Sequence, residues 1–389
     1  MSHTFMGYVR PDGQVGCRNH VAVIPSVTCA GDVASAIVRQ VAGTVGYFHH
    51  QGCCQLPPDL DRVTETLISL GCSPNVGAAL IVSLGCEGTD TERLYDAVRA
   101  SGKPAAIIRI QELGGVSAAI KAGIDAAQEL VMEISGMART PVDISRAVMS
   151  IKCGASDTTS GMASNCVIGY IADKLVDLGA AVIFGETTEF LGGEHLLARR
   201  AVSPEVGQQI YGIVERMEAR ARSLGCDMRK GQPTPGNIEG GLSSIEEKSL
   251  GAIVKSGTRP IQGVLDYPER IGERKGLWIK DTPGREPEIL TGMAATGAQF
   301  MMFSTGRGAP QGFPTMPVLK VCGNPHTYAR MEHDMDLNAG RIITGEASIE
   351  QVGEQAFAAI LALLSGRQTK NETLGYHSSI DIYTMGPVI

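Results

Sequence analysis

The stretch "HVAVIPSVTCAGDVASAIVRQVAGTVGYFHH" (residues 20–50) decides the fold class. It contains an apolar, β-branched run at 20–27, an amphipathic run at 30–42 and a second apolar run at 44–50. Such runs are typical of a strand, a helix and the next strand of a parallel sheet. The stretch therefore predicts a βαβ unit.

The same alternation continues along the chain. It runs to residue 134, and the stretch "SGMARTPVD" (135–143) then predicts a domain boundary. Beyond it we expect helices at 163–178, 192–200, 204–224 and 349–365, and strands at 147–154, 180–186, 260–267, 275–281, 298–305 and 318–324. The sequence thus predicts an α/β fold with two regions of largely parallel sheet and flanking helices. We expect an N-terminal α/β domain (1–140) and a C-terminal α/β catalytic domain (141–389).

Charge and composition narrow the function classes. The 389 residues carry a net charge of −7 and no Lys- or Arg-rich run, which argues against nucleic acid and an anionic membrane surface as partners. No apolar run approaches the length of a membrane span, and the N-terminus lacks the apolar segment of a signal peptide. The ten cysteines then indicate free thiols in a reducing cytoplasm. Fingerprints for dinucleotides, nucleoside triphosphates and a serine nucleophile are absent.

Polar clusters follow four of the expected strands. They are "HHQGCCQ" (49–55), "LGCEGTD" (84–90), "KCGASDTTSG" (152–161) and "GETTEF" (185–190). Ligands of open parallel sheets bind outside the carboxyl ends of the strands. We therefore expect the functional site at the carboxyl ends of the strands, between the two regions of sheet.

Three of these clusters carry a cysteine beside a glycine. Cys53, Cys86 and Cys153 are candidate ligands of an iron–sulfur cluster or a soft divalent metal, and buried unliganded cysteine is the alternative. His49 is a candidate for a metal ligand or a proton-transfer group. Glu186 and Glu189 either share a site or cap a helix.

Other segments carry groups suited to an anion or a hard metal. "FSTGRG" (303–308) presents backbone N–H groups and Arg307, and "GNIEGGLSSIEEKSLG" (236–251) begins a helix that carries Lys248. Arg18 and Asn19 form either a substrate clamp or an ordinary turn. The segment "HDMDLNAG" (333–340) is either a hard-metal grouping or a solvated junction.

Eight motifs in order resemble the altronate/galactarate dehydratase family over about residues 6–345. They are "GYVRPDGQVGCRNH", "GCCQL", "SPNVGAALIVSLGCE", "KCGASDTTSGMASN", "GETTEFLGGEH", "GNIEGGLSSIEEKSLG", "FSTGRG" and "DMDLNAG". The resemblance implies a metal-dependent lyase that uses iron (Fe²⁺ or an iron–sulfur cluster) or manganese. Such a lyase removes the proton α to a carboxylate and then water, which turns a hydroxy acid into a 2-keto-3-deoxy acid.

The resemblance, together with the residue patterns, assigns expected roles. The catalytic candidates are His49, Asp157, Glu186, Glu189 and Lys248. The substrate-binding candidates are Arg18, Asn19, Ser156, Asn237, Thr305 and Arg307. The metal candidates are Cys53, Cys86 and Cys153.

Two departures from the family pattern leave alternatives open. The small N-terminal domain of the sugar-acid members has no counterpart here, so we expect a separate small subunit and an oligomer. "SDTT" and "GETTEFLGGEH" resemble the large subunit of the sulfo-lyase members, which expel sulfite from sulfolactate instead of water. A third alternative is an inactive subunit that only binds a small acid.

Overall fold

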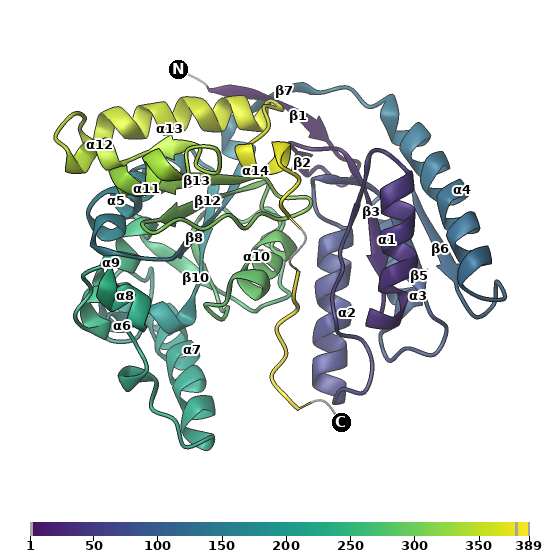
Figure 1. Ribbon diagram of the computed structural model, residues 1–389, viewed down its shortest axis with the longest axis horizontal. Coiled ribbons are helices and arrows are strands. Elements are labelled where there is room, and N and C mark those ends of the chain that lie inside the picture. Colours follow the sequence, from purple (N-terminus) through teal and green to yellow (C-terminus); the bar gives the residue numbers. More distant parts are fainter. Residues whose placement is uncertain (1–2, 378–379, 388–389) are drawn as a thin grey trace.

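The computed structural model describes residues 3–377 and 380–387 and contains two parallel sheets with helices on both faces (Figure 1). The N-terminal sheet has the strand order β4-β3-β5-β6. Its strands are β3 (His20–Pro25), β4 (Thr44–Gly46), β5 (Val76–Ser83) and β6 (Ala105–Arg109). All eight residues of β5 are buried, as expected of a parallel strand covered on both faces.

The C-terminal sheet has seven parallel strands in the order β10-β11-β9-β8-β12-β13-β14. Its strands are β8 (Val148–Gly154), β9 (Ala181–Phe184), β10 (Ile261–Leu265), β11 (Gly276–Lys280), β12 (Phe300–Thr305), β13 (Val318–Cys322) and β14 (Leu337–Asn338). The predicted α/β fold with two parallel sheet regions is confirmed.

Successive side chains of β12 pack into different cores on the two faces of the sheet. On β12, Phe300 and Met302 face the core formed with α5 (Asn165–Asp177), α7 (Pro204–Ser223) and α13 (Ile349–Leu364). Met301 and Phe303 face the opposite core, because successive strand residues point to opposite faces. The outer face of the N-terminal sheet packs on α1 (Gly31–Gln40) and α4 (Val116–Ser135).

The middle core joins the two sheets. It contains residues of β3 and β5, of β9 and β12, and of the helices α2 (Pro57–Gly71), α3 (Thr91–Ala100) and α10 (Glu286–Ala295) between them. The C-terminal segment runs along this junction, where Ile380 and Ile382 are buried in the same core (Figure 1). The two sheets therefore share one apolar core, and that core fixes their relative position.

A small antiparallel sheet lies beside these layers and was not predicted. It consists of β2 (Val15–Gly16), β1 (Thr4–Val9) and β7 (Thr140–Asp143). β7 follows the expected boundary, yet it pairs with the first strand of the chain. The division near residue 140 stays a prediction.

The remaining differences are local. The strand expected at 44–50 ends at Gly46, and helix α10 was not predicted. The loop 229–244 contains the short helix α8 (Pro235–Glu239) and is followed by α9 (Ile245–Ile253). Among the described residues, none of the helices has the length and hydropathy needed to cross a bilayer.

Candidate functional site

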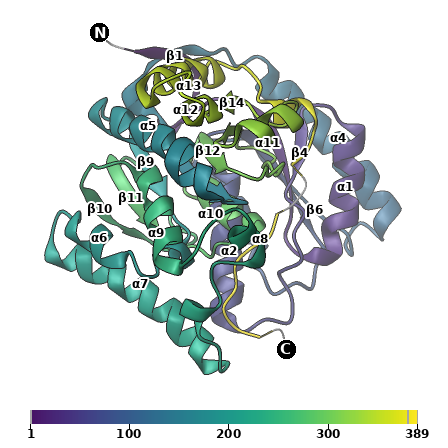
Figure 2. The same ribbon diagram turned by 60° about the vertical axis from the view of Figure 1, so that its left-hand side comes forward.

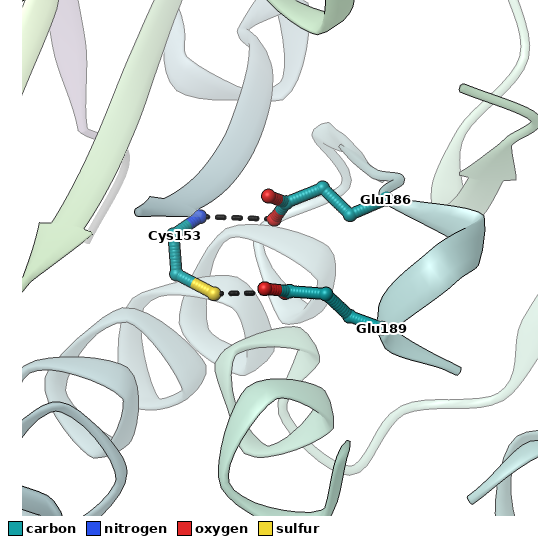
Figure 3. Close-up of side chains that lie close together, drawn as sticks. All are labelled: Cys153, Glu186 and Glu189. Atoms are coloured by element: carbon teal, nitrogen blue, oxygen red, sulfur yellow. Dashed lines mark hydrogen bonds between the residues drawn. The ribbon is translucent and has the colours of Figure 1, made fainter. Parts of the chain in front are cut away.

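A buried group of charged side chains lies where β8 and β9 end (Figure 3). We call it the lysine–glutamate cluster; its members are Lys152, Cys153, Glu186, Glu189 and Lys255. The first two come from the end of β8, and the two glutamates belong to the turn after β9. Lys255 comes from the 3-10 turn that extends α9. The parallel neighbours β8 and β9 bring their carboxyl ends together, which explains why residues more than thirty positions apart meet here.

Lys255 stands at the centre of the cluster. Its Nζ lies 2.9 Å from Cys153 Sγ, 2.5 Å from Glu186 Oε2 and 2.8 Å from Glu189 Oε2. The side chain is 1% exposed. One ammonium group therefore donates to all three acceptors at once.

The other contacts close the network. Lys152 Nζ donates to Glu186 Oε1 at 2.7 Å, and the Cys153 N–H donates to Glu186 Oε2 at 3.0 Å. The Cys153 thiol donates to Glu189 Oε2 at 2.9 Å. Two ammonium groups face two carboxylates around one thiol, so the buried charges balance with the thiol protonated.

The protonation states follow from these neighbours. Burial raises the pKa of the Cys153 thiol well above its usual range, and Glu189 adds to that rise. Burial alone would raise the pKa of Glu189, but Lys255 and then Lys248 hold that pKa well below its usual range. Burial lowers the pKa of Lys255, but its contacts with Cys153 and Glu186 raise that pKa well above the ordinary value. The cluster thus holds ionised Glu189 and Lys255 beside a neutral thiol.

The same geometry tests the cluster as a metal site. One ligand atom each from Cys153, Glu186 and Glu189 lie within 4.8 Å of one another, and thiolate plus carboxylates can hold a divalent ion. Yet Lys255 Nζ contacts all three of those atoms, so the space that an ion would take is filled by the ammonium. The triad does not fit a metal while Lys255 keeps this position.

Glu186 is held in an unusual backbone conformation. Its φ is +70°, a left-handed value that residues with a Cβ adopt at a cost of about 1–3 kcal/mol. Its N–H donates to Thr282 Oγ1 at 2.9 Å. Non-glycine residues with positive φ concentrate at functional sites, and here the conformation turns a carboxylate back onto the end of β8.

A cavity of about 610 Å³ opens next to the cluster. Its walls come from the segment after β8, the first turn of α5 and helix α9, which lie side by side (Figure 2). Lys248 lines it and donates from Nζ to Gln232 Oε1 at 2.7 Å. Val254, the residue before Lys255, also lines it, and Lys248 acts on the pKa of Glu189. The cavity and the cluster are therefore neighbours.

Asp157 forms the cavity wall nearest the end of β12. Its Oδ1 accepts from the Thr159 hydroxyl at 2.6 Å and from the Ser160 N–H at 3.0 Å, and its Oδ2 accepts from Asn324 Nδ2 at 3.1 Å. Gly306 packs directly against this carboxylate. Both carboxylate oxygens of Asp157 therefore accept hydrogen bonds from the protein, and these bonds fix the segment that leads into α5.

The other expected binding residues surround Asp157. Asn237 Nδ2 donates to the Ser156 carbonyl at 3.0 Å, which ties α8 to the segment after β8. Arg307 donates to the Gly236 carbonyl and, at 2.9 Å, to Glu239 Oε2. Thr305 Oγ1 accepts from the Gly308 N–H at 3.0 Å. The structure therefore brings Ser156, Asp157, Asn237, Thr305 and Arg307 together, beside the cavity that Lys248 lines.

His49, Cys53 and Cys86 lie in a different place, at the carboxyl end of the N-terminal sheet. His49 Nε2 lies 2.8 Å from the Pro25 carbonyl, its Nδ1 accepts from the Gln51 N–H at 3.2 Å, and burial lowers its pKa to about 4. Cys53 and Cys86 are exposed, whereas Cys153 is buried. Because Cys153 belongs to the other sheet, these three thiols do not form a group of ligand atoms within 4.8 Å.

Arg18 and Asn19 lie at the opposite end of the strands. The neighbouring Cys17 contacts the carbonyl of Gln299, which precedes β12, whereas the site follows β12. Both Arg18 Nε and Nη2 donate to Glu372, at 2.7 and 2.8 Å. Asn19 Oδ1 accepts from Arg10. Both side chains fasten the N-terminal segment and are not brought to the site.

The hard-ligand grouping, one of the two alternatives for the segment 333–340, is not formed among the described residues. Asp336 instead accepts from the N–H groups of Lys320 at 2.8 Å and Lys370 at 3.0 Å.

Sequence reasoning missed the roles of Lys152 and Lys255. Lys152 lies within the mostly apolar strand β8, and Lys255 follows the apolar stretch "LGAIV". A lysine inside an apolar segment indicates a buried acceptor for its ammonium, either a carboxylate or a carbonyl, and that pattern was the available indication.

Comparison with known proteins identifies two matching sequence profiles. The sequence profile of the C-terminal domain of D-galactarate/altronate dehydratase matches residues 144–388. The profile of the second domain of D-galactarate dehydratase/altronate hydrolase matches residues 7–135.

Three curated relatives align with nearly the whole chain. The β subunit of (2R)-sulfolactate sulfo-lyase from Chromohalobacter salexigens is 38% identical over 97% of this chain and 96% of the relative. Galactarate dehydratase (L-threo-forming) from Escherichia coli is 33% identical over 99% of this chain and 77% of the relative. Altronate dehydratase from Bacillus subtilis is 29% identical over 95% of this chain and 76% of the relative. The chain therefore belongs to the D-galactarate/altronate dehydratase family of lyases.

Proposed function

We propose that the chain is the catalytic subunit of a β-eliminating lyase that acts on a 2-hydroxy acid. The observation that supports this most is the cavity at the carboxyl end of β8, which Lys248 lines and beside which its charge lowers the pKa of Glu189. A cation in a cavity beside ionised carboxylates offers an anchor for the acid and an acceptor for its α-proton. This function implies a small-molecule hydroxy acid as the partner of the cavity.

We assign the steps to the residues that line or adjoin the cavity. Lys248 binds the anionic end of the acid, and the segment 156–160 positions its hydroxyl groups. Glu189 is 8% exposed and Glu186 1%, so Glu189 is the more accessible carboxylate of the cluster, and we assign it the α-proton. The C–H electron pair forms the double bond, the leaving group departs with its own pair, and the enol becomes a 2-keto acid.

We favour sulfite as the leaving group. The sulfo-lyase subunit has the highest identity of the three relatives and matches this chain over almost its full length. The second candidate is loss of water from an altronate- or galactarate-type acid, which the family profile and the dehydratase relatives support. Both reactions break the same α-C–H bond and differ only in the group expelled.

The resemblance implies iron or manganese, but we assign no step to a metal. The only Cys/Glu group with metal-ligand spacing among the described residues is the one that Lys255 fills. The steps above use the ammonium groups of the chain as the positive charges.

We also propose a separate small subunit. The sulfo-lyase relative is named as a subunit. The dehydratase relatives extend beyond the matched part; the match covers 77% of the galactarate dehydratase. Co-expression with the neighbouring reading frame and size-exclusion chromatography test this directly. A stable complex of both chains is expected.

Turnover assays decide the reaction. The complex is incubated with (2R)-sulfolactate, altronate and galactarate, and sulfite and 2-keto acid are both quantified. Sulfite and pyruvate in equal amounts are expected from sulfolactate. If a 2-keto product forms only from the sugar acids, the leaving group is water and not sulfite. Binding of all three acids without turnover would favour an inactive binding subunit.

Lys248→Met tests the cavity as the place of reaction. We expect KM to rise at least tenfold, because the anchoring cation is lost. Lys230→Met is the matched control, since that side chain is 86% exposed and pairs only with Asp227. Equal kinetics of both variants would place the acid elsewhere.

A further inference from the structure

We propose that Lys255 is the built-in cation of the Cys153–Glu186–Glu189 triad and excludes a divalent metal ion from it. The proposal concerns the triad alone and does not depend on which acid the chain converts. It predicts a site with metal-ligand spacing that binds no metal in the natural chain.

The Lys255 ammonium occupies the space that a metal ion would need. A divalent ion bound by a thiolate and two carboxylates needs each ligand atom at about 2.0–2.3 Å from one point. Lys255 Nζ already lies at 2.5–2.9 Å from the same three atoms, so an ion among them would collide with it. The ammonium would have to leave before a metal could enter.

The backbone on both sides of Lys255 is anchored. Arg200 donates to Ser256 Oγ at 2.9 Å and to the Ser256 carbonyl at 3.3 Å, which fixes the residue after Lys255. On the other side, Gly169 packs so closely that a Cβ there would lie 2.4 Å from the Val254 carbonyl oxygen. Lys255 itself is 1% exposed. The fixed backbone places the Lys255 side chain beside the triad, and its three contacts hold the buried ammonium there.

The buried charges of the cluster already cancel without a metal ion. Among the side chains that are almost fully buried, Lys152 and Lys255 contribute two positive charges, and Glu186 and Glu189 two negative ones. Glu286 lies 3.6 Å from Lys152 Nζ but is 33% exposed, so water screens its charge. Adding a divalent ion leaves this buried site with excess positive charge, which is costly away from water. Replacing Lys255 by a neutral side chain leaves one excess negative charge, and a divalent ion bound to the Cys153 thiolate would restore neutrality.

One substitution should therefore convert the triad into a metal site. In Lys255→Met, Co²⁺ binding forms a Co–S bond to Cys153 and releases the thiol proton to solvent. We expect one equivalent of Co²⁺ with a thiolate-to-cobalt charge-transfer band and a rise in melting temperature on adding Co²⁺ or Zn²⁺. The wild-type chain should show neither the band nor the rise.

Two further variants control the assignment. Lys255→Met/Cys153→Ser should lose the charge-transfer band, since the sulfur is gone. Lys255→Met/Glu189→Gln removes one charge of each sign, keeps the buried site neutral, and should bind no metal. If Lys255→Met does not fold, the wild-type measurement below still decides the proposal.

Metal analysis of the wild-type chain, purified anaerobically with its partner, gives the direct test. We expect either no iron, manganese or zinc, or metal that is retained in full by Cys153→Ser and Glu189→Gln and thus lies outside the triad. One equivalent of metal that both substitutions remove would overturn the proposal. So would a wild-type cobalt band that depends on Cys153.

Discussion

Gly306 lies against the carboxylate of Asp157, and a Cβ atom on Gly306 would stand 1.9 Å from Asp157 Oδ1. Gly306→Ala should therefore push Asp157 away from the Thr159 and Ser160 donors that it now binds. Overpacking of this kind costs about 1–3 kcal/mol in the free energy of unfolding. Urea unfolding and KM measurements check this, and we expect KM to rise because the cavity wall shifts.

Gly212→Ala is the matched control for that prediction. Gly212 lies within α7, is exposed, and a Cβ there would meet nothing within 4 Å. The substitution should stabilise the helix by up to about 1 kcal/mol and leave KM unchanged. A Gly306→Ala enzyme as stable and active as wild type would show that Asp157 does not need its present position.

Lys103 provides a pH prediction away from the site. It is buried, donates to the Ser73 carbonyl at 2.6 Å, and burial lowers its pKa to about 7. The unfolded chain keeps the ordinary lysine pKa and binds more protons between about pH 7 and pH 10. The penalty from Lys103 is thus fully present below about pH 7 and fades as pH rises, so its contribution to stability grows across that window.

Lys103→Met removes that titration. We expect the variant to melt above wild type at pH 7, and the difference in melting temperature to shrink toward pH 10. Lys121→Met is the control, because Lys121 is 81% exposed. A difference in melting temperature that stays constant from pH 7 to pH 10 would mean that Lys103 keeps its charge in the folded state.

Single residues also mark the limit of what sequence patterns can predict. The thiol Cys153 was found because it lies at the end of a strand, and the carboxylates Glu186 and Glu189 because they follow one, since neighbouring parallel strands end together. Cys53 and Cys86 follow strands as well, but the pattern does not say which sheet a strand joins. Lys255 was noted only as a residue of the helix that carries Lys248, because only the tertiary packing of α9 brings it to the triad.

Helix α9 carries Lys248 into the cavity, and Ser244 begins that helix. The Ser244 hydroxyl accepts from the Glu247 N–H at 3.2 Å. Ser244→Ala should cost about 1 kcal/mol in the free energy of unfolding, as loss of a serine cap does. We also expect a higher KM, because Lys248 lies one turn further along the same helix and Ser244 itself lines the cavity.

Ser348→Ala separates these two effects. Ser348 caps α13 in the same way and accepts from the Gln351 N–H at 3.2 Å, but it does not line the cavity. It should lose similar stability and keep its KM. If both variants raise KM equally, the change reflects general destabilisation and not the position of α9.

Elements with a strong period were predictable from the sequence, and those defined by pairing were not. The strand β5 and helix α2 follow directly from their apolar patterns. Strand β1 has a short alternating pattern that does not predict its partner, because it pairs with β7, more than 130 residues later in the chain. Helix α10 is apolar nearly all round, because it lies between the two sheets, and therefore shows no helical period.

At the scale of the whole molecule, the shared core should make the two sheets unfold together. Trp278, the one tryptophan of the chain, lies on β11 and reports on the C-terminal sheet, whereas far-ultraviolet circular dichroism reports on both. A chain of this length with separable domains would show two transitions. We expect tryptophan fluorescence and circular dichroism to give one common urea midpoint, and distinct midpoints would contradict the shared core.

The C-terminal segment 380–387 is the part of that core most open to test. Ile382 is 1% exposed in the middle core, and Asp59 of α2 accepts from the N–H groups of Met385 at 2.8 Å and Gly386 at 2.5 Å. Ile382→Ala should cost about 2–5 kcal/mol in the free energy of unfolding, measured by urea denaturation. Met385→Ala is the control, because that side chain is 41% exposed and only its backbone binds Asp59. Equal, small losses in both variants would mean that the segment rests on the junction without stabilising it.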